Sequence, residues 1–142
     1  MTEPFFLLFT RRPTGQGLRW WHHLLDARCA HVVVVQPMVV GSLVVQPFGK
    51  VLKVEWSYHP AEDQARGLMW AWNARALRVP APPEQEAPPE LRPFMTCVEV
   101  AKAMLGLSAW WIVTPRQLWW ALVARGARVV PRFVWPERER IA

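Results

Sequence analysis

The sequence predicts a single α+β domain in which a small antiparallel sheet packs against two helices from the C-terminal part of the chain. The chain has 142 residues, of which 52% are hydrophobic. That is enough for one core, too short for two domains, and too apolar for a largely disordered protein. Short β-branched or alternating runs recur in the first half, and two capped helix starts follow at Thr96 and Thr114.

Residues 4–56 are predicted to form four strands and one helix. Residues 4–10 are an apolar run that reads as a short buried strand, and residues 18–28 have helical spacing. Residues 31–36 are rich in valine and pair naturally with residues 43–46 as a hairpin. Residues 51–56 alternate apolar and polar side chains, as a strand with one buried face does.

A helix is predicted to begin after Pro60, because proline fixes φ and acidic residues follow it in the first turn. Asn73 is expected to close this helix, whose buried face would include Trp72. Residues 75–79 then read as a short strand. Residues 80–93 are crowded with prolines and acids, which predicts a long surface loop rather than a domain linker.

The second half contains two helix starts with the capping-box pattern. In the first, Thr96 and Glu99 are spaced so that each satisfies a free backbone amide of the other, and Gly106 ends the helix. The second begins at Thr114, has proline at its first helical position, and has Gly126 past its end. Two further helices are therefore expected on the sheet.

The last predicted strand covers residues 128–134, so that one domain spans residues 1–135 and residues 136–142 form a flexible tail. No stretch approaches the roughly 20 apolar residues that a membrane span needs. The apolar run near the N-terminus is short and follows an acidic residue, unlike a signal peptide. We therefore expect no signal peptide, no membrane span, and a location in the cytoplasm or in a virion assembled there.

The net charge is +6, mostly from arginine, since lysine occurs only at Lys50, Lys53 and Lys102. The arginines are scattered and form no run, so specific nucleic-acid binding is not expected, although gathering of the arginines on one face would favour it. Two cysteines cannot build a disulfide scaffold. In a reducing compartment both are expected to be free thiols.

Cys97 is the most informative residue for chemistry. A thiol in the first turn of a helix faces unpaired backbone N–H groups and the positive end of the helix dipole, which favour the nucleophilic thiolate. The same amides can donate to an oxyanion formed after attack on a carbonyl. The alternative is that Cys97 is a small residue packed at the end of a helix.

A cysteine nucleophile needs a base, and imidazole is the usual one. The chain offers His22, His23, His31 and His59. His31 opens the valine-rich strand, which would hold its ring at the edge of a packed sheet. The other three lie on a surface helix or in a turn, and a histidine at a strand start can equally be structural.

Hairpin geometry suggests a third site residue. If the turn covers residues 37–40, Gln36 faces Gly41 and His31 faces Gln46. Directly opposed residues share a face of the sheet and lie in contact. Gln46 would then orient the imidazole, as the third member of a triad does. A one-residue slip of the register would destroy this pairing.

A strand led by histidine, a polar residue on the next strand, and a later capped helix beginning Thr-Cys-Val-Glu resemble the circularly permuted papain-like (NlpC/P60-type) cysteine hydrolases. The block at residues 92–118 more narrowly resembles small proteins encoded by tailed phages and prophages. The resemblance implies a permuted papain-like fold with Cys97 as nucleophile, His31 as base and Gln46 as the orienting residue. It also implies peptidase or amidase activity, or action on another acyl substrate such as a lipid, with no cofactor.

Two other functions remain open from the sequence. A phage structural or assembly protein could keep the fold without turnover, with other phage proteins as partners. Alternatively, Cys29, His31 and Cys97 could bind a metal ion, since the first two share a strand face. No C-x-x-C pair supports this, and no metal site is expected.

The ten tryptophans invite a stacking role, but most are expected in the core because each buries a large area. On the helix after Thr114, the predicted buried face is Leu118, Trp119 and Leu122. Trp120 and Val123 would then form an exposed apolar patch, which would suit assembly into a larger particle.

Overall fold

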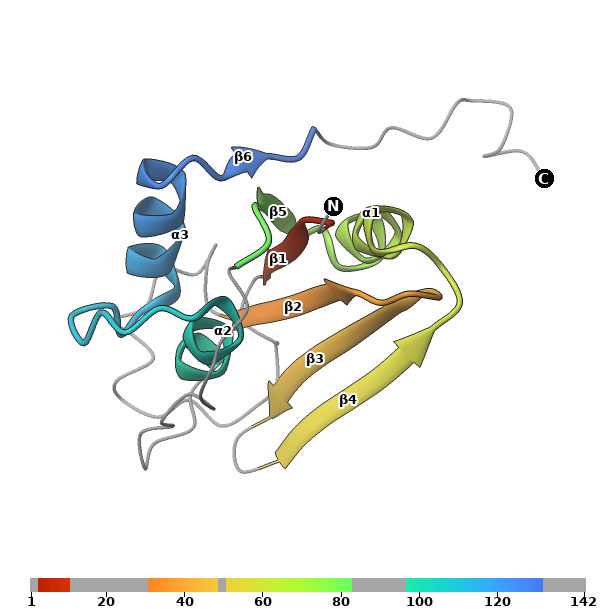
Figure 1. Ribbon diagram of the computed structural model, residues 1–142, viewed down its shortest axis with the longest axis horizontal. Coiled ribbons are helices and arrows are strands. Elements are labelled where there is room, and N and C mark those ends of the chain that lie inside the picture. The colour runs from red at the N-terminus through yellow and green to blue at the C-terminus, as the bar shows by residue number, and fades with distance from the viewer. Residues whose placement is uncertain (1–2, 11–30, 49–50, 83–96, 132–142) are drawn as a thin grey trace.

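The computed structural model describes residues 3–10, 31–48, 51–82 and 97–131 (Figure 1). These residues form a six-stranded antiparallel sheet with three helices, which confirms the α+β class and the antiparallel sheet. The predicted helix at 18–28, most of the loop at 80–93, and the tail at 136–142 lie outside the described residues. So does Thr96, the predicted cap of the cysteine helix.

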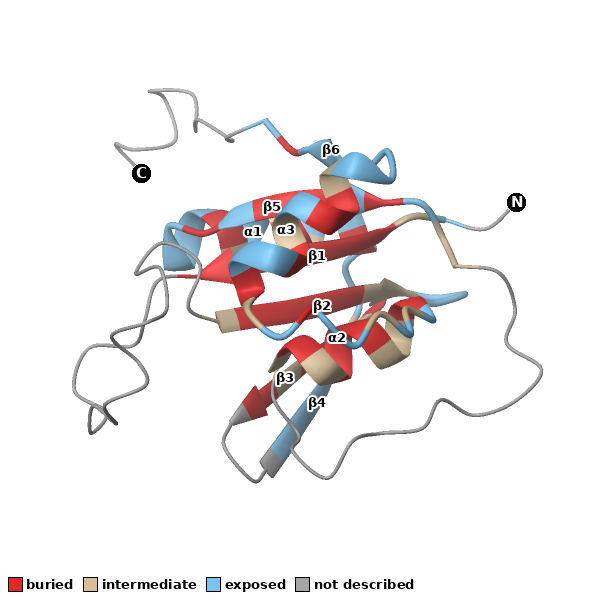
Figure 2. Cartoon of the chain, turned by 90° about the vertical axis from the view of Figure 1, so that its left-hand side faces the viewer, coloured by how far each residue is buried: buried red, intermediate tan, exposed pale blue. Residues whose placement is uncertain are grey.

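The strands are β1 (Phe5–Thr10), β2 (His31–Pro37), β3 (Ser42–Phe48), β4 (Val51–Ser57), β5 (Arg75–Val79) and β6 (Arg128–Val129). Their order across the sheet is β4-β3-β2-β1-β5-β6, so β1 is internal and β4 lies at one edge. All six residues of β1 are buried (Figure 2). Five of them are consecutive apolar residues, because a strand covered on both faces cannot alternate with polar side chains.

The helices are α1 (Ala61–Trp72), α2 (Cys97–Leu105) and α3 (Pro115–Ala124). Helices α2 and α3 cover one face of the sheet and α1 covers the other (Figure 1). Along β1, Leu7 and Phe9 pack toward α2 and α3, whereas Phe6 and Leu8 pack toward α1. The sheet is therefore the middle layer between two cores.

The helix ends follow the predicted capping chemistry. The Thr114 hydroxyl accepts a hydrogen bond from the Gln117 amide at 3.2 Å, and the Gln117 side chain accepts one from the Thr114 amide at 3.1 Å. Gly106 directly follows α2 with a positive φ of 69°, and Gly126 follows Arg125, the C-cap residue of α3, with a positive φ of 98°. Asn73 plays the same part after α1, with φ of 50°. The predicted ends of all three helices are confirmed.

The predicted register of the hairpin is wrong. Gln36 pairs with Leu43 and Pro37 with Ser42, so the turn covers residues 38–41, closed by a 3.1 Å hydrogen bond from the Met38 amide to the Gly41 carbonyl. Gly41 belongs in the turn because its φ is +79° and because a Cβ there would overlap the Ser57 carbonyl of β4. A contact with a third strand therefore selects the register.

Replacing Gly41 with alanine is expected to lower the free energy of unfolding by at least about 2 kcal/mol, because the left-handed φ and the overlap with Ser57 both oppose a side chain. The matched control is Gly67→Ala in the middle of α1, where an added Cβ meets no atom within 4 Å. That change is expected to stabilise by about 0.5–1 kcal/mol. Urea denaturation measures both, and equal effects would contradict the role of Gly41 in the turn.

Candidate active site

Cys97 is the first residue of α2, as the sequence predicts, and it carries a free thiol that is half-buried against the core beneath α2. Its sulfur is within hydrogen-bonding reach of the backbone amides of Val98 and Cys97 itself. A third backbone hydrogen bond comes from Val32, the second residue of β2. The N-terminus of α2 therefore meets the beginning of the strand that His31 opens.

Burial raises the pKa of the Cys97 thiol above its usual value, and it outweighs the backbone hydrogen bonds, which act in the opposite direction. The predicted amide donors are thus in place, but the resting group is a neutral thiol. Formation of the thiolate needs a base or a change in its surroundings.

His31 is half-buried, and burial lowers the pKa of its imidazole. A neutral imidazole at pH 7 is the form that can accept a proton. In the sheet, His31 lies opposite Thr10, at the ends of β2 and β1. His31 also directly precedes Val32, whose backbone contacts the Cys97 sulfur.

The side chains of His31 and Val32 point to opposite faces of the sheet. Val32 packs in the core beneath α2, whereas Val33 packs in the core beneath α1. Alternation along β2 assigns His31 to the face of Val33. The structure therefore brings Cys97 close to the backbone next to His31, not to the imidazole itself. A Cys97–His31 pair would require the imidazole to reach around the end of β2.

Gln46 is half-buried in β3 and lies opposite Lys53 of β4. The ladder between β2 and β3 runs from Val34–Val45 to Pro37–Ser42, and β3 then turns away from β2 (Figure 1). In this register, position 46 is displaced by two residues from the predicted place opposite His31. The predicted direct opposition of Gln46 and His31 is therefore wrong.

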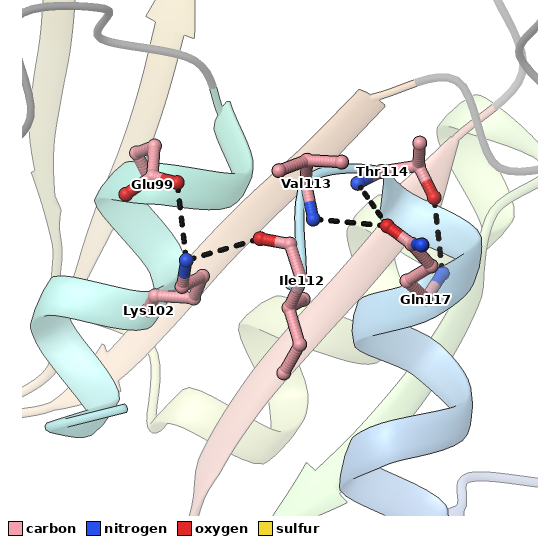
Figure 3. A network of polar contacts seen from close by, with 6 residues as sticks. All are labelled: Glu99, Lys102, Ile112, Val113, Thr114 and Gln117. Atoms are coloured by element: carbon pink, nitrogen blue, oxygen red, sulfur yellow. Dashed lines mark hydrogen bonds and ion pairs between the residues drawn. The ribbon is translucent and has the colours of Figure 1, made fainter. Parts of the chain in front are cut away.

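A buried ion pair beside this site escaped the sequence analysis. Lys102 is only 3% exposed, and its ammonium group contacts the Glu99 carboxylate at 3.1 Å and the Ile112 carbonyl at 3.0 Å (Figure 3). These contacts tie α2 to the segment that leads into α3. The spacing of Glu99 and Lys102, three residues apart on a helix, was the available signal. Their burial depends on the chain that covers them.

A second feature is an apolar groove of about 400 Å³ on α3, whose lining includes Trp111, Trp120 and Arg116. Trp120 is 60% exposed, which confirms its predicted exposure. Val123 packs partly against the core, so its predicted place in the same patch is wrong.

The expectation that most tryptophans are core residues is wrong for the described part of the chain. Trp119 packs partly in the core, where its ring meets Phe9 edge-on at 5.0 Å between centroids. The other described tryptophans are exposed by 37% to 72%: Trp56, Trp70, Trp72, Trp110, Trp111 and Trp120. Helical spacing placed Trp72 on the buried face of α1, but that face is carried by Ala61, Ala65 and Met69.

Cys29, one member of the metal-binding alternative, lies outside the described residues. Within the described ranges, no group of three histidine, cysteine or acidic side chains could hold a metal ion. Among the same residues, no helix has the length and hydropathy required to cross a membrane. In comparisons with known proteins, no family model, no curated protein and no solved structure matches the chain.

Proposed function

We propose that the protein is a thiol hydrolase that attacks an amide or related acyl bond through Cys97, with His31 as the base. The observation that carries the proposal is the meeting of the N-terminus of α2 with the beginning of β2, which are far apart in the sequence. In this proposal the fold is a permuted papain-like one, with the histidine strand before the cysteine helix. The substrate is a peptide or another acyl compound, met in the cytoplasm or in a virion.

The proposed reaction begins from a neutral thiol and a neutral imidazole. His31 takes the proton from the Cys97 sulfur, and the thiolate attacks the carbonyl carbon. The backbone N–H groups at the start of α2 donate to the oxyanion as the new S–C bond takes the sulfur lone pair. The imidazolium returns its proton to the leaving amine, and water then hydrolyses the thioester. Gln46 has no part in this proposal.

The test is the rate of Cys97 alkylation by iodoacetamide against pH, read by mass spectrometry. Burial alone gives a midpoint above the ~8.5 of an ordinary thiol, whereas proton transfer to His31 gives a midpoint below it. The proposal predicts the lower midpoint in the native protein and its loss in His31→Ala. His59→Ala is the matched control, since this exposed histidine follows β4 in a turn. A pH midpoint of alkylation above ~8.5 that His31→Ala leaves unchanged would contradict the proposed enzymatic function.

A structural or assembly protein of a phage is the second candidate, and two observations favour it. The Cys97 thiol is held neutral by burial, and exposed tryptophans border an apolar groove on α3. Groove-lining tryptophans are typical of surfaces that bind another protein. An inert Cys97 in the alkylation experiment would favour this function.

A further inference from the structure

Among the strands that the structure describes, β4 has one edge without a neighbouring strand. It lies at the end of the strand order and has β3 as its neighbour on one side. Leu52, Val54 and Trp56 are 41%, 49% and 48% exposed on the face that α2 covers farther along the sheet. Figure 2 shows β4 as exposed where β1 and β2 are buried. Half-exposed apolar side chains on an unpaired edge are the usual signature of a surface that receives another strand.

The other face of β4 carries a pair of opposite charges. Lys53 and Glu55 are two residues apart and form an ion pair of 2.8 Å, with side chains that are 52% and 60% exposed. Because they share a strand face, a second strand laid along this edge would place its own side chains directly beside them.

The sequence of β4 is complementary to itself in one register. When two copies of a strand pair antiparallel about a two-fold axis, directly opposed residues must lie on the same face of the sheet. Because side chains alternate between the faces, the axis passes beside one residue and its copy, not between two neighbouring residues. An axis at Lys53 or at Glu55 sets like charges against each other. An axis at Val54 sets each Lys53 against Glu55 of the second copy and each Leu52 against Trp56 of the second copy.

The apolar face of β4 has a side chain that is already held in place. The Trp56 indole donates a hydrogen bond of 3.1 Å to the Val40 carbonyl, and its ring meets Tyr58 edge-on at 4.3 Å between centroids. A side chain held in place before binding loses little conformational entropy on binding. Trp56 therefore offers a fixed apolar surface to Leu52 of the second copy.

We propose that two copies of the protein form a symmetric dimer by antiparallel pairing of β4 with β4, centred on Val54. The pairing joins two six-stranded sheets into one and satisfies the outward backbone groups of both edges. Opposite charges on one face and apolar side chains on the other select this register over its neighbours. The proposal does not depend on catalysis by Cys97.

Charge reversal tests the register. In the register centred on Val54, position 53 of each copy faces position 55 of the other. Lys53→Glu therefore places two acidic side chains opposite each other at both of these contacts, and Glu55→Lys places two basic side chains opposite each other. Each single variant is expected to raise the dimer dissociation constant at least about tenfold in analytical ultracentrifugation. Mixing the two variants, or combining both changes in one chain, is expected to restore dimers. Arg116→Glu on α3 is the control, because it changes the net charge as Lys53→Glu does at an exposed site away from β4.

A cross-link tests the axis directly. Val54→Cys is expected to form a disulfide between two copies under mild oxidation, mapped by mass spectrometry, whereas Val39→Cys at the exposed hairpin tip is not. Circular dichroism confirms that each variant is folded. A wild-type protein that stays monomeric at about 1 mM, or dimers that are indifferent to both charge reversals, would overturn the proposal.

Discussion

Replacing Glu99 with alanine is expected to lower the free energy of unfolding by about 3–5 kcal/mol, because it leaves the Lys102 ammonium buried without its carboxylate. Lys102 is 3% exposed and its side chain lies between α2 and the segment before α3. Glu99 itself has a side chain that is only 13% exposed, so water replaces the lost contact poorly. Chemical denaturation monitored by tryptophan fluorescence measures the loss.

The matched control is Glu62→Ala, which removes the ion pair of 2.9 Å between Glu62 and Arg66 on the exposed side of α1. An exposed pair of this spacing contributes only about 0.3–0.5 kcal/mol. The double variant Glu99→Met/Lys102→Met removes both buried charges and is expected to lose less stability than Glu99→Ala alone. Equal losses in Glu99→Ala and Glu62→Ala would mean that Lys102 reaches solvent.

Local signals were sufficient for most of the elements. Pro115 and the Thr114–Gln117 box mark the start of α3 in the sequence, and Gly106 and Gly126 mark helix ends, since each acts through bonds to residues a few positions away. The turn before β3 was missed because its position depends on Ser57, a residue on another strand. Register is a tertiary property wherever a turn touches a third element.

The candidate site likewise has some features that were predictable from local sequence and others that depend on tertiary packing. The place of Cys97 at the start of α2 was predictable from capping alone. The rise in the pKa of its thiol was not, because it comes from packing against β2, which lies far away in the sequence. The burial of Lys102 depends on packing in the same way, as does the placement of Val32, rather than His31, on the face that α2 covers. The local sequence pattern predicts where a helix begins, whereas tertiary packing determines the chemistry of its side chains.

Truncation of Phe9 to alanine is the second change with a large expected effect, a loss of about 3–5 kcal/mol. Phe9 is 1% exposed and lies on the internal strand β1, beneath α2 and α3. Its ring meets Trp119 at an interplanar angle of 81°. Removing the ring therefore leaves a cavity and also ends an aromatic contact worth about 0.5–1.5 kcal/mol.

Val39→Ala is the control for Phe9→Ala, because Val39 is fully exposed at the hairpin tip and is expected to change stability by less than about 0.5 kcal/mol. Trp119 provides a second readout. Loss of the ring beside it should change its near-ultraviolet circular dichroism, while the far-ultraviolet spectrum keeps the signal of the folded sheet. If Phe9→Ala unfolds at the same urea concentration as Val39→Ala, α3 does not pack on β1 through this contact, and the core beneath α2 and α3 is assembled differently.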